Sequence, residues 1–144
     1  MLRYRLVHPQ LLGALAGSGH GSRILLADAN YAHDVNVRAG APVIHLNLRA
    51  GLVRIDDILE LIVDAAPIES VHTMRPDEGG EPAAWIRYRE LLGSDRALQP
   101  LDRQAFYAAA RAADLAFAVA TGDERLYANV LLTIGYIRPE PRPT

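Results

Sequence analysis

The hydrophobic positions of this chain predict four helices, each with apolar residues three or four positions apart. Pro9 opens the first helix, and Asp102 is the expected N-cap of the last, which runs to about residue 113. The clearest helix ends before Pro67. Its apolar face consists of Ile55, Ile58, Leu59, Ile62 and Val63. The remaining helix is marked by Trp85, Tyr88, Leu91 and Leu92.

Continuous apolar runs between these helices predict strands, because a strand covered on both faces has few polar positions. The runs are residues 24–27, 43–48, 71–74, 115–120 and 130 to about 137. The alternation predicts an α/β protein, a three-layer α/β/α sandwich around a mostly parallel central sheet. We expect residues 1–144 to form a single domain, with residues 138–144, which include three prolines, as a flexible tail.

Composition narrows the class of protein. A chain of 144 residues, half of them hydrophobic and 22% charged, is large enough to bury a core. The net charge of -2 and the lack of a basic cluster argue against nucleic-acid binding. The absence of cysteine excludes disulfides and thiolate zinc sites. No apolar run is long enough to span a membrane, so we expect no membrane partner and a cytoplasmic location.

Two polar segments directly follow predicted strands, and in open α/β sheets ligands bind beyond the carboxyl ends of strands. Asp28 follows the run 24–27, and Thr121 follows the run 115–120. Both segments are therefore candidates for a site. Asp28-Ala29-Asn30 also has a structural interpretation, because Asp and Asn often close turns on their own backbone.

His20 lies in a glycine-rich turn, residues 17–21, eight residues before Asp28. These glycines follow a helix and precede a strand, the reverse of a dinucleotide-binding loop, so nucleotide binding is not predicted. A turn histidine is more often solvated or capping than catalytic. An imidazole paired with a carboxylate would supply acid–base chemistry near neutral pH. The five histidines have no metal-ligand spacing, so no metal is predicted.

Two further segments offer groups that could hold a small polar ligand. Tyr127-Ala128-Asn129 supplies a hydroxyl, a flat ring and an amide that both donates and accepts. Arg103 follows the expected N-cap of the last helix. Each has an ordinary alternative, a surface arginine and an unremarkable loop triplet, so neither indicates a function alone.

Together, these segments resemble the ribose pyranase and fucose mutarotase family. The first block is Leu11-Leu12-x-x-Leu15-Ala16-x-x-Gly19-His20-Gly21, followed by Ile24 to Asp28-Ala29-Asn30. The second is Arg103-x-x-Phe106-Tyr107, then Thr121-Gly122-Asp123, then Tyr127-Ala128-Asn129-Val130-Leu131-Leu132 and Gly135. Order and approximate spacing fit the family over nearly the whole chain, and the two blocks together are more specific than either alone.

The resemblance implies an isomerase, a monosaccharide mutarotase or pyranase that interconverts anomers by opening and reclosing the sugar ring. It implies catalytic roles for His20 as proton donor, for Asp28 and for Tyr127. Sugar contacts are implied for Asp28, Arg103, Tyr127, Ala128 and Asn129. It also implies a homo-oligomer, commonly a decamer, and a reaction without a cofactor.

The sugar remains open, because the chain mixes features of two branches. Arg103 is typical of the fucose branch, whereas Ala128 is typical of the ribose branch. Tyr31-Ala32 stands where the fucose branch has Phe-Pro, Asp123 stands where glutamate is usual, and segment 31–51 departs most from the pattern. We therefore predict a fucose-like or ribose-like substrate and leave pyranose–furanose conversion open.

Two other functions fit the same residues. A non-catalytic monosaccharide-binding accessory protein of sugar uptake would keep Asp28, Arg103 and Asn129 but would not need a titrating His20. A hydrolase or lyase built on the His–Asp pair is the weaker alternative, because the chain has no nucleophile motif such as Gly-x-Ser-x-Gly.

Overall fold

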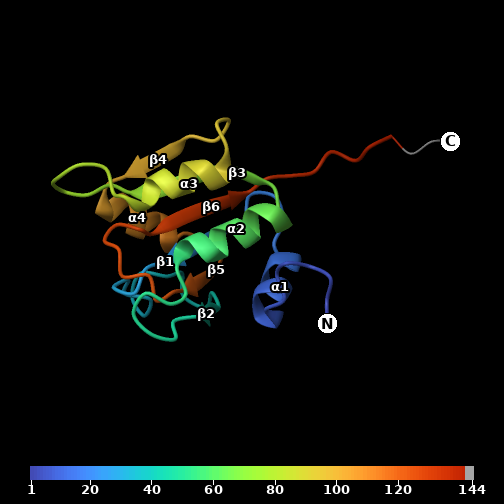
Figure 1. Cartoon of the computed structure of the whole chain (residues 1–144), viewed down its shortest axis with the longest axis horizontal. Coiled ribbons are helices and arrows are strands. Elements are labelled where there is room, and N and C mark those ends of the chain that lie inside the picture. Colours follow the sequence, from blue (N-terminus) through green and yellow to red (C-terminus); the bar gives the residue numbers. More distant parts are fainter. Residues whose placement is uncertain (142–144) are drawn as a thin grey trace.

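Six strands form one mixed sheet in the order β2-β5-β1-β6-β3-β4 (Figure 1). A computed structural model describes residues 1–141. The strands are β1 (Arg23–Ala27), β2 (Val43–His45), β3 (Ile68–Met74), β4 (Leu98–Leu101), β5 (Leu115–Ala120) and β6 (Val130–Ile134). Strand β6 is antiparallel to both neighbours, and the other pairs are parallel. The predicted mostly parallel sheet is confirmed.

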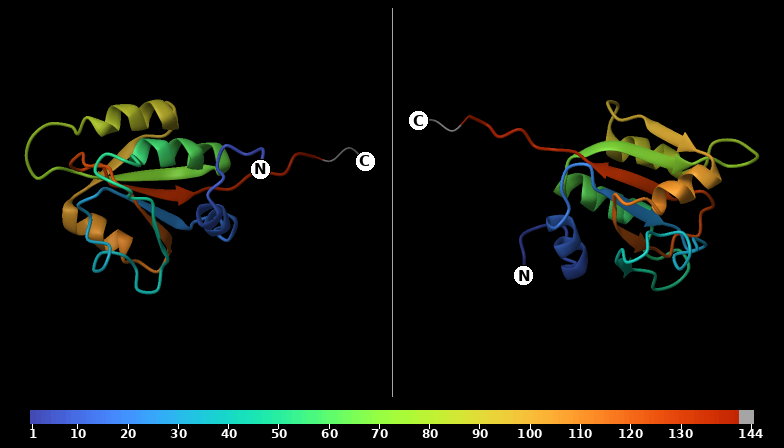
Figure 2. Two further views of the ribbon diagram at one scale, coloured as in Figure 1. Left: turned by 60° about the horizontal axis from the view of Figure 1, so that its bottom comes forward. Right: turned by 180° about the vertical axis from the view of Figure 1, so that it is seen from behind.

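Four helices complete the fold: α1 (Pro9–Ala16), α2 (Ile55–Ala65), α3 (Ala84–Leu92) and α4 (Arg103–Ala110). Helices α2 and α3 lie side by side on one face of the sheet, and α4 covers the other face (Figure 2). This arrangement confirms the predicted three layers. Helix α1 lies beyond one end of the sheet and buries Leu11 (Figure 1).

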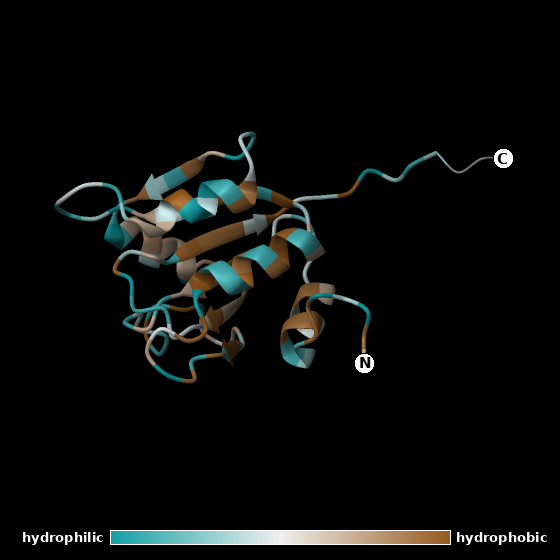
Figure 3. Ribbon diagram, viewed as in Figure 1, coloured by the Kyte–Doolittle hydropathy of each residue, from teal (hydrophilic) through white to brown (hydrophobic). Residues whose placement is uncertain are grey.

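The core divides between the two faces, because successive side chains of a strand point to opposite sides. In β1, Ile24 and Leu26 pack with the α2–α3 layer, whereas Leu25 packs with Phe106 of α4. All four of these side chains are fully buried. Figure 3 shows the same division, with apolar strands in the middle and polar outer surfaces on the helices.

Local sequence explains where the helices begin and end. Asp102 caps α4 as predicted, since its Oδ1 accepts a 2.9 Å hydrogen bond from the main-chain N–H of Ala105. Asp57 of α2 accepts a 3.0 Å bond from the N–H of Arg54. Helix α2 stops before Pro67, where the chain becomes extended.

Strand lengths differ from the predictions where a partner strand ends. Strand β2 stops at His45 rather than at residue 48, because its only neighbour, β5, ends at Ala120. Strand β6 stops at Ile134 rather than at about residue 137, because β1 and β3 offer no partners beyond it. Helix α4 ends at Ala110, three residues earlier than predicted.

One strand was not predicted from the sequence. Strand β4 contains Pro100 and pairs only with β3, and an edge strand tolerates a residue without an N–H. Residues 138–141 of the predicted tail are exposed and have no regular secondary structure, and 142–144 lie outside the described residues. Within residues 1–141, no helix combines the length and apolar character needed to cross a membrane.

Candidate functional site

The polar segments identified in the sequence meet at one edge of the sheet, the edge formed by the ends of the strands rather than by an outermost strand. Strands β1 and β5 end there, and β6 begins there because it runs in the opposite direction. The segments that follow β1 and precede β6 are joined directly. The main-chain N–H of Asp28 donates a 2.7 Å hydrogen bond to Oδ1 of Asn129. The N–H of Ala29 donates a 2.8 Å bond to the carbonyl of Asp123, which follows β5.

A cavity of about 200 Å³ opens at this edge. Its lining residues come from four segments of the chain, and they are Asp28, Asn30, Tyr31, Met74, Arg103, Tyr107, Leu126, Tyr127 and Asn129. Four of the six predicted site residues therefore surround one hollow. Ala128 is fully buried between Tyr127 and Asn129.

Asp28 is a buried carboxylate at the cavity wall, with 4% of its surface exposed. Its Oδ1 accepts a 3.0 Å hydrogen bond from the N–H of Asn30, which closes the turn after β1. Burial raises the pKa of Asp28 to about 6, and the nearby Asp123 carboxylate adds to the shift. A carboxyl group that titrates near 6 can exchange a proton with a ligand near neutral pH.

Helix α3 fixes the segment that carries Tyr127 and Asn129. Tyr127 has a left-handed backbone, with φ of 57°, a conformation uncommon outside glycine. Its carbonyl accepts a 3.3 Å bond from Nε1 of Trp85. The next carbonyl, that of Ala128, accepts a 2.7 Å bond from the buried hydroxyl of Tyr88. These two bonds hold a strained backbone at the cavity, as is common at functional sites.

The loop between β5 and β6 is anchored by a charged network behind the cavity. Nε and Nη2 of Arg125 donate to the two carboxylate oxygens of Asp123, at 2.9 and 2.6 Å, and Nη2 also contacts Asp56 at 2.9 Å. Burial would raise the pKa of Asp123, but hydrogen bonds from Arg125 and from the N–H of Ile55 outweigh it and lower that pKa. Asp123 is therefore an ionised support for the loop.

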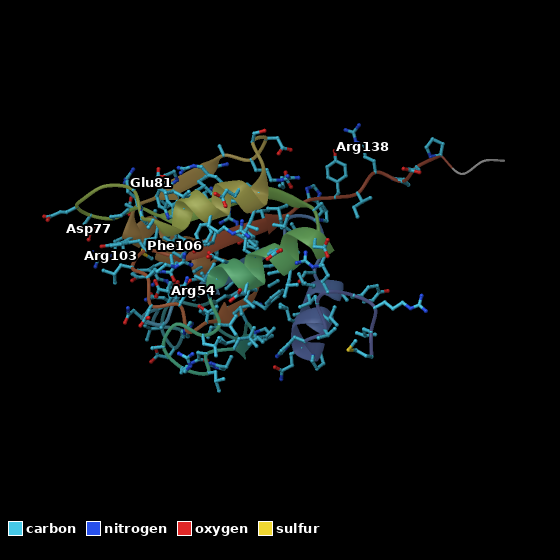
Figure 4. All side chains as sticks on the ribbon, in the orientation of Figure 1. Arg54, Asp77, Glu81, Arg103, Phe106 and Arg138 are labelled. Atoms are coloured by element: carbon cyan, nitrogen blue, oxygen red, sulfur yellow. The ribbon has the colours of Figure 1, made fainter. Side chains whose placement is uncertain are left out.

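Arg103 reaches the cavity from the first turn of α4. Figure 4 shows it at the same end of the molecule as Asp77, with which it forms an ion pair. Both side chains are about half exposed. Tyr107 lies one turn further along α4 and also lines the cavity. The four-residue spacing from Arg103 was the signal in the sequence that could have identified Tyr107.

Tyr31 and Met74 were also missed as lining residues, because each looks like an ordinary core residue. Tyr31 follows Asp28 by three residues, and its hydroxyl donates a 2.7 Å bond to the carbonyl of Asn36. Met74 is the last residue of β3. Tyr31 reaches the cavity because it closely follows β1 in the sequence, whereas Met74 is brought there only by the order of strands, in which β6 alone separates β3 from β1.

His20 lies at the opposite edge of the sheet, before the first residue of β1. The N–H of Gly21 donates a 2.9 Å bond to the carbonyl of Ile134, the last residue of β6. Strand β1 separates His20 from Asp28, and five residues of strand span about 16 Å. Within one chain, the structure therefore does not bring His20 to the cavity that holds the other predicted residues.

Among the other histidines, the ring of His33 lies 5.5 Å from that of Tyr31, a residue of the cavity wall, and 6.2 Å from that of His45. His8 caps α1, since its Nδ1 accepts a 3.2 Å bond from the N–H of Leu11. His45 is the exposed last residue of β2, and His72 is half-buried in β3. Residues 1–141 contain no group of three or more His, Asp or Glu side chains arranged to hold a metal ion.

Comparisons with known proteins identify relatives of this chain. The chain is 38% identical to the fucose mutarotase of Danio rerio over 92% of its own length and 90% of that protein. It is 33% identical to the fucose mutarotase of Homo sapiens, with 94% and 93% covered.

Two solved structures share the fold. The fucose mutarotase of Streptococcus pneumoniae, in complex with L-fucose, superposes with a TM-score of 0.82 at 28% identity over 96% of this chain and 100% of that one. RbsD of Bacillus subtilis, complexed with D-ribose, gives a TM-score of 0.83 over the same shares at 23% identity, which supports the fold alone. The family model described as the RbsD / FucU transport protein family matches residues 1–137. The chain belongs to this family, as its sequence motifs predicted.

Proposed function

We propose that this protein is a monosaccharide mutarotase, an isomerase that opens and recloses the ring of a fucose-like or ribose-like sugar. The observation that most supports this proposal is the cavity that the buried Asp28 lines together with Tyr127, Asn129 and Arg103. The relatives named fucose mutarotases, at 38% and 33% identity, support the same class of enzyme. A cytoplasmic location stays a prediction from the sequence.

The proposed reaction needs only proton transfers. Ring opening removes the proton of the anomeric hydroxyl and adds a proton to the ring oxygen as the bond between that oxygen and C1 breaks. Rotation about the C1–C2 bond and reclosure then give the other anomer, so the reaction consumes no cofactor. General acid–base catalysis of this kind contributes on the order of 10²–10⁴-fold.

The residues at the cavity divide these tasks. Asp28 accepts the anomeric proton, for which a pKa of about 6 is well matched to neutral pH. Arg103 donates to sugar hydroxyls, and Asn129 offers its amide nitrogen while its oxygen holds the Asp28 N–H. Tyr127 presents its ring and hydroxyl and can relay a proton. Ala128 is fully buried between Tyr127 and Asn129 and packs in the core on the α2–α3 face of the sheet.

We further propose that His20 of a neighbouring copy supplies the proton for the ring oxygen. In one chain, His20 lies at the edge of the sheet opposite to Asp28, with its side chain 53% exposed. An assembly that places the His20 edge of one copy against the cavity edge of the next joins two different surfaces. Such head-to-tail contacts form a ring when the rotation from one copy to the next closes on itself. A ring-shaped homo-oligomer, such as a decamer, is therefore part of the proposal.

The activity is tested by NMR exchange spectroscopy between the anomer signals of L-fucose, D-ribose, D-galactose and L-rhamnose. We expect faster exchange for at least one of these sugars with the wild-type protein, and loss of that acceleration in D28N. A sugar that binds, as detected by saturation-difference NMR, without faster exchange would instead establish the sugar-binding accessory protein.

The contribution of a second copy is tested by mixing H20A and D28N chains, each inactive alone. If sites are shared between copies, refolding the two together restores activity, because some sites combine an intact His20 with an intact Asp28. Random assembly restores up to about a quarter of the wild-type sites. Mixed assemblies that form, as shown by native mass spectrometry, but remain inactive would exclude His20 acting between copies.

A further inference from the structure

We propose that Tyr136 is a further sugar-contact residue, which a neighbouring copy brings to the cavity together with His20. This inference rests on the proposed function, in which His20 of one copy meets the cavity of the next. Its basis is the contact between the two rings, whose centroids lie 5.1 Å apart and whose planes are inclined by 55°. Any copy that places His20 at a sugar therefore places Tyr136 beside it, because a monosaccharide is no smaller than this separation.

The backbone just beyond β6 is fixed to the turn that carries His20. The N–H of Ile134, the last residue of β6, donates a 2.9 Å hydrogen bond to the carbonyl of Ser22 in that turn. The N–H of Gly135 then donates a 2.8 Å bond to the carbonyl of Pro67, directly before β3. These bonds tie the start of the C-terminal tail to the turn, so both rings belong to the same edge of the sheet.

Tyr136 stays open to contact despite its neighbours. The guanidinium of Arg138 lies 5.9 Å from the centre of its ring, at the end of the molecule opposite to Arg103 (Figure 4). The His20 imidazole also contacts Glu69, at 2.7 Å from Nε2. Tyr136 is still 56% exposed, and the side chain of His20 is 53% exposed. A ligand held by another copy can therefore reach both rings.

The two edges that would meet in an assembly both expose apolar side chains. At the cavity edge, Leu126 lines the cavity and is 67% exposed, and Leu48, three residues after β2, is 79% exposed. At the other edge, Ile137 is 78% exposed beside Tyr136. Aromatic residues are enriched and charged residues are depleted at the centre of protein interfaces. The exposed apolar residues thus favour docking of the His20 edge of one copy onto the cavity of the next.

A tyrosine ring suits the part of a sugar that the polar cavity residues leave unmatched. Asp28, Arg103 and Asn129 offer groups for hydroxyls, whereas the C–H groups on one face of a sugar ring are apolar. A flat aromatic ring covers such a face, and its phenol hydroxyl keeps a polar partner or water. This contact is present in the substrate and in the transition state alike, so it lowers KM and leaves kcat nearly unchanged.

The test compares Y136A, Y136L and Y136F with the wild-type protein, and Y4A serves as a matched control. Tyr4 is also an exposed tyrosine, at 70%. We expect Y136A to raise KM for anomer exchange about tenfold, as for loss of one well-packed aromatic contact, and to change kcat by less than about twofold. Y136F keeps the ring and should match the wild type, Y136L should lie between, and Y4A should have no effect.

Mixed assemblies show from which copy Tyr136 acts. Refolding Y136A with D28N should create sites that combine the intact cavity of the first chain with the intact Tyr136 and His20 of the second. Random assembly gives up to about a quarter of such sites, and they should have the wild-type KM. Refolding Y136A with H20A should create none, because no chain then carries both rings. NMR exchange at a sugar concentration below the wild-type KM measures these sites, and native mass spectrometry verifies the mixing.

The outcomes separate this inference from the proposed function. Wild-type KM in Y136A, or no wild-type sites in Y136A–D28N assemblies, would overturn the role of Tyr136, while loss of activity in D28N would leave the mutarotase standing. Loss of assembly in both Y136A and Y136L would assign Tyr136 to the interface between copies instead, and would also overturn the sugar contact. A wild-type protein that neither binds nor interconverts any of the sugars would end the proposed function, and this inference with it.

Discussion

The main-chain N–H of Asp28 is bound to the side-chain oxygen of Asn129, 101 residues later in the sequence, at 2.7 Å. The bond joins the end of β1 to the start of β6, which lie side by side because these strands are antiparallel. Both residues are 4% exposed and line the cavity. The side chain of Asn129 therefore makes a contact that holds the fold together and also lines the cavity for which we propose sugar binding.

Replacing Asn129 should damage both stability and activity. In N129L the buried N–H of Asp28 loses its acceptor, which costs about 1–3 kcal/mol in the free energy of unfolding. N129D keeps an acceptor at the same position and should lose less stability. Urea unfolding of the two variants measures the difference. Equal stability of N129L and the wild type would show that the bond contributes nothing.

The buried Asp28 should make stability fall as pH rises. The pKa of Asp28 is about 6 in the folded chain, against an ordinary value of 3.8, so between these two pH values the folded state binds more protons than the unfolded one. The contribution of Asp28 to the free energy of unfolding is fully present below about pH 4 and is lost as pH rises through about 6. A difference of about two pH units between the folded and unfolded pKa corresponds to about 3 kcal/mol in the free energy of unfolding.

The variant D28N isolates this effect, because an amide does not titrate. We expect D28N to be more stable than the wild type at pH 7.5, by up to about 3 kcal/mol, and to approach it at pH 4. Anomer exchange by the wild type should slow below about pH 6, where Asp28 is protonated and cannot accept a proton. Urea unfolding at several pH values tests the first point, and a difference independent of pH would contradict it.

Gly122 should tolerate no side chain. A Cβ at this position would lie 2.2 Å from the carbonyl oxygen of Leu52 and 2.3 Å from that of Arg49, both backbone atoms. G122A should therefore cost several kcal/mol and disturb the loop that carries Asp123.

Gly13 provides the matched control, because nothing lies within 4 Å of a Cβ there and the residue is inside α1. G13A should be neutral or stabilising by roughly 0.5–1 kcal/mol. Thermal unfolding of both variants makes the comparison, and a stable G122A would show that segment 49–52 can move away at little cost.

Tyr88 should support the cavity without touching the sugar. Y88F keeps the buried ring but removes the hydroxyl bound to the carbonyl of Ala128. We expect a loss of about 1–2 kcal/mol in the free energy of unfolding and weaker sugar binding, since Tyr127 and Asn129 are less well fixed. Isothermal titration with the active sugar measures the binding.

Tyr4 is the matched control for this variant, because it is 70% exposed. Y4F should leave both stability and binding unchanged. Wild-type affinity in Y88F would mean that the bond to Ala128 does not position the segment.

How much of the molecule the sequence predicts depends on how local each feature is. Helix α4 begins where Asp102 caps it, and α2 ends before Pro67, because these signals act within a few residues. The ends of β2 and β6 were predicted too long, since the end of a strand depends on a partner elsewhere in the chain. The edge strand β4 could not be predicted, because its short sequence with Pro100 looks the same as that of a loop.

By itself, the sequence determined the family, the layered α/β fold and the residues that carry the proposed chemistry. Motifs and hydrophobic periodicity involve residues that are close together in the sequence, so they can be recognised without the structure. Only the tertiary structure decided which of those residues meet. The direction of β6 places Asn129 beside Asp28, and the length of β1 places His20 at the far edge, in contact with Glu69. The physical reason is that a strand is a rigid spacer, so its two ends belong to different surfaces of the molecule.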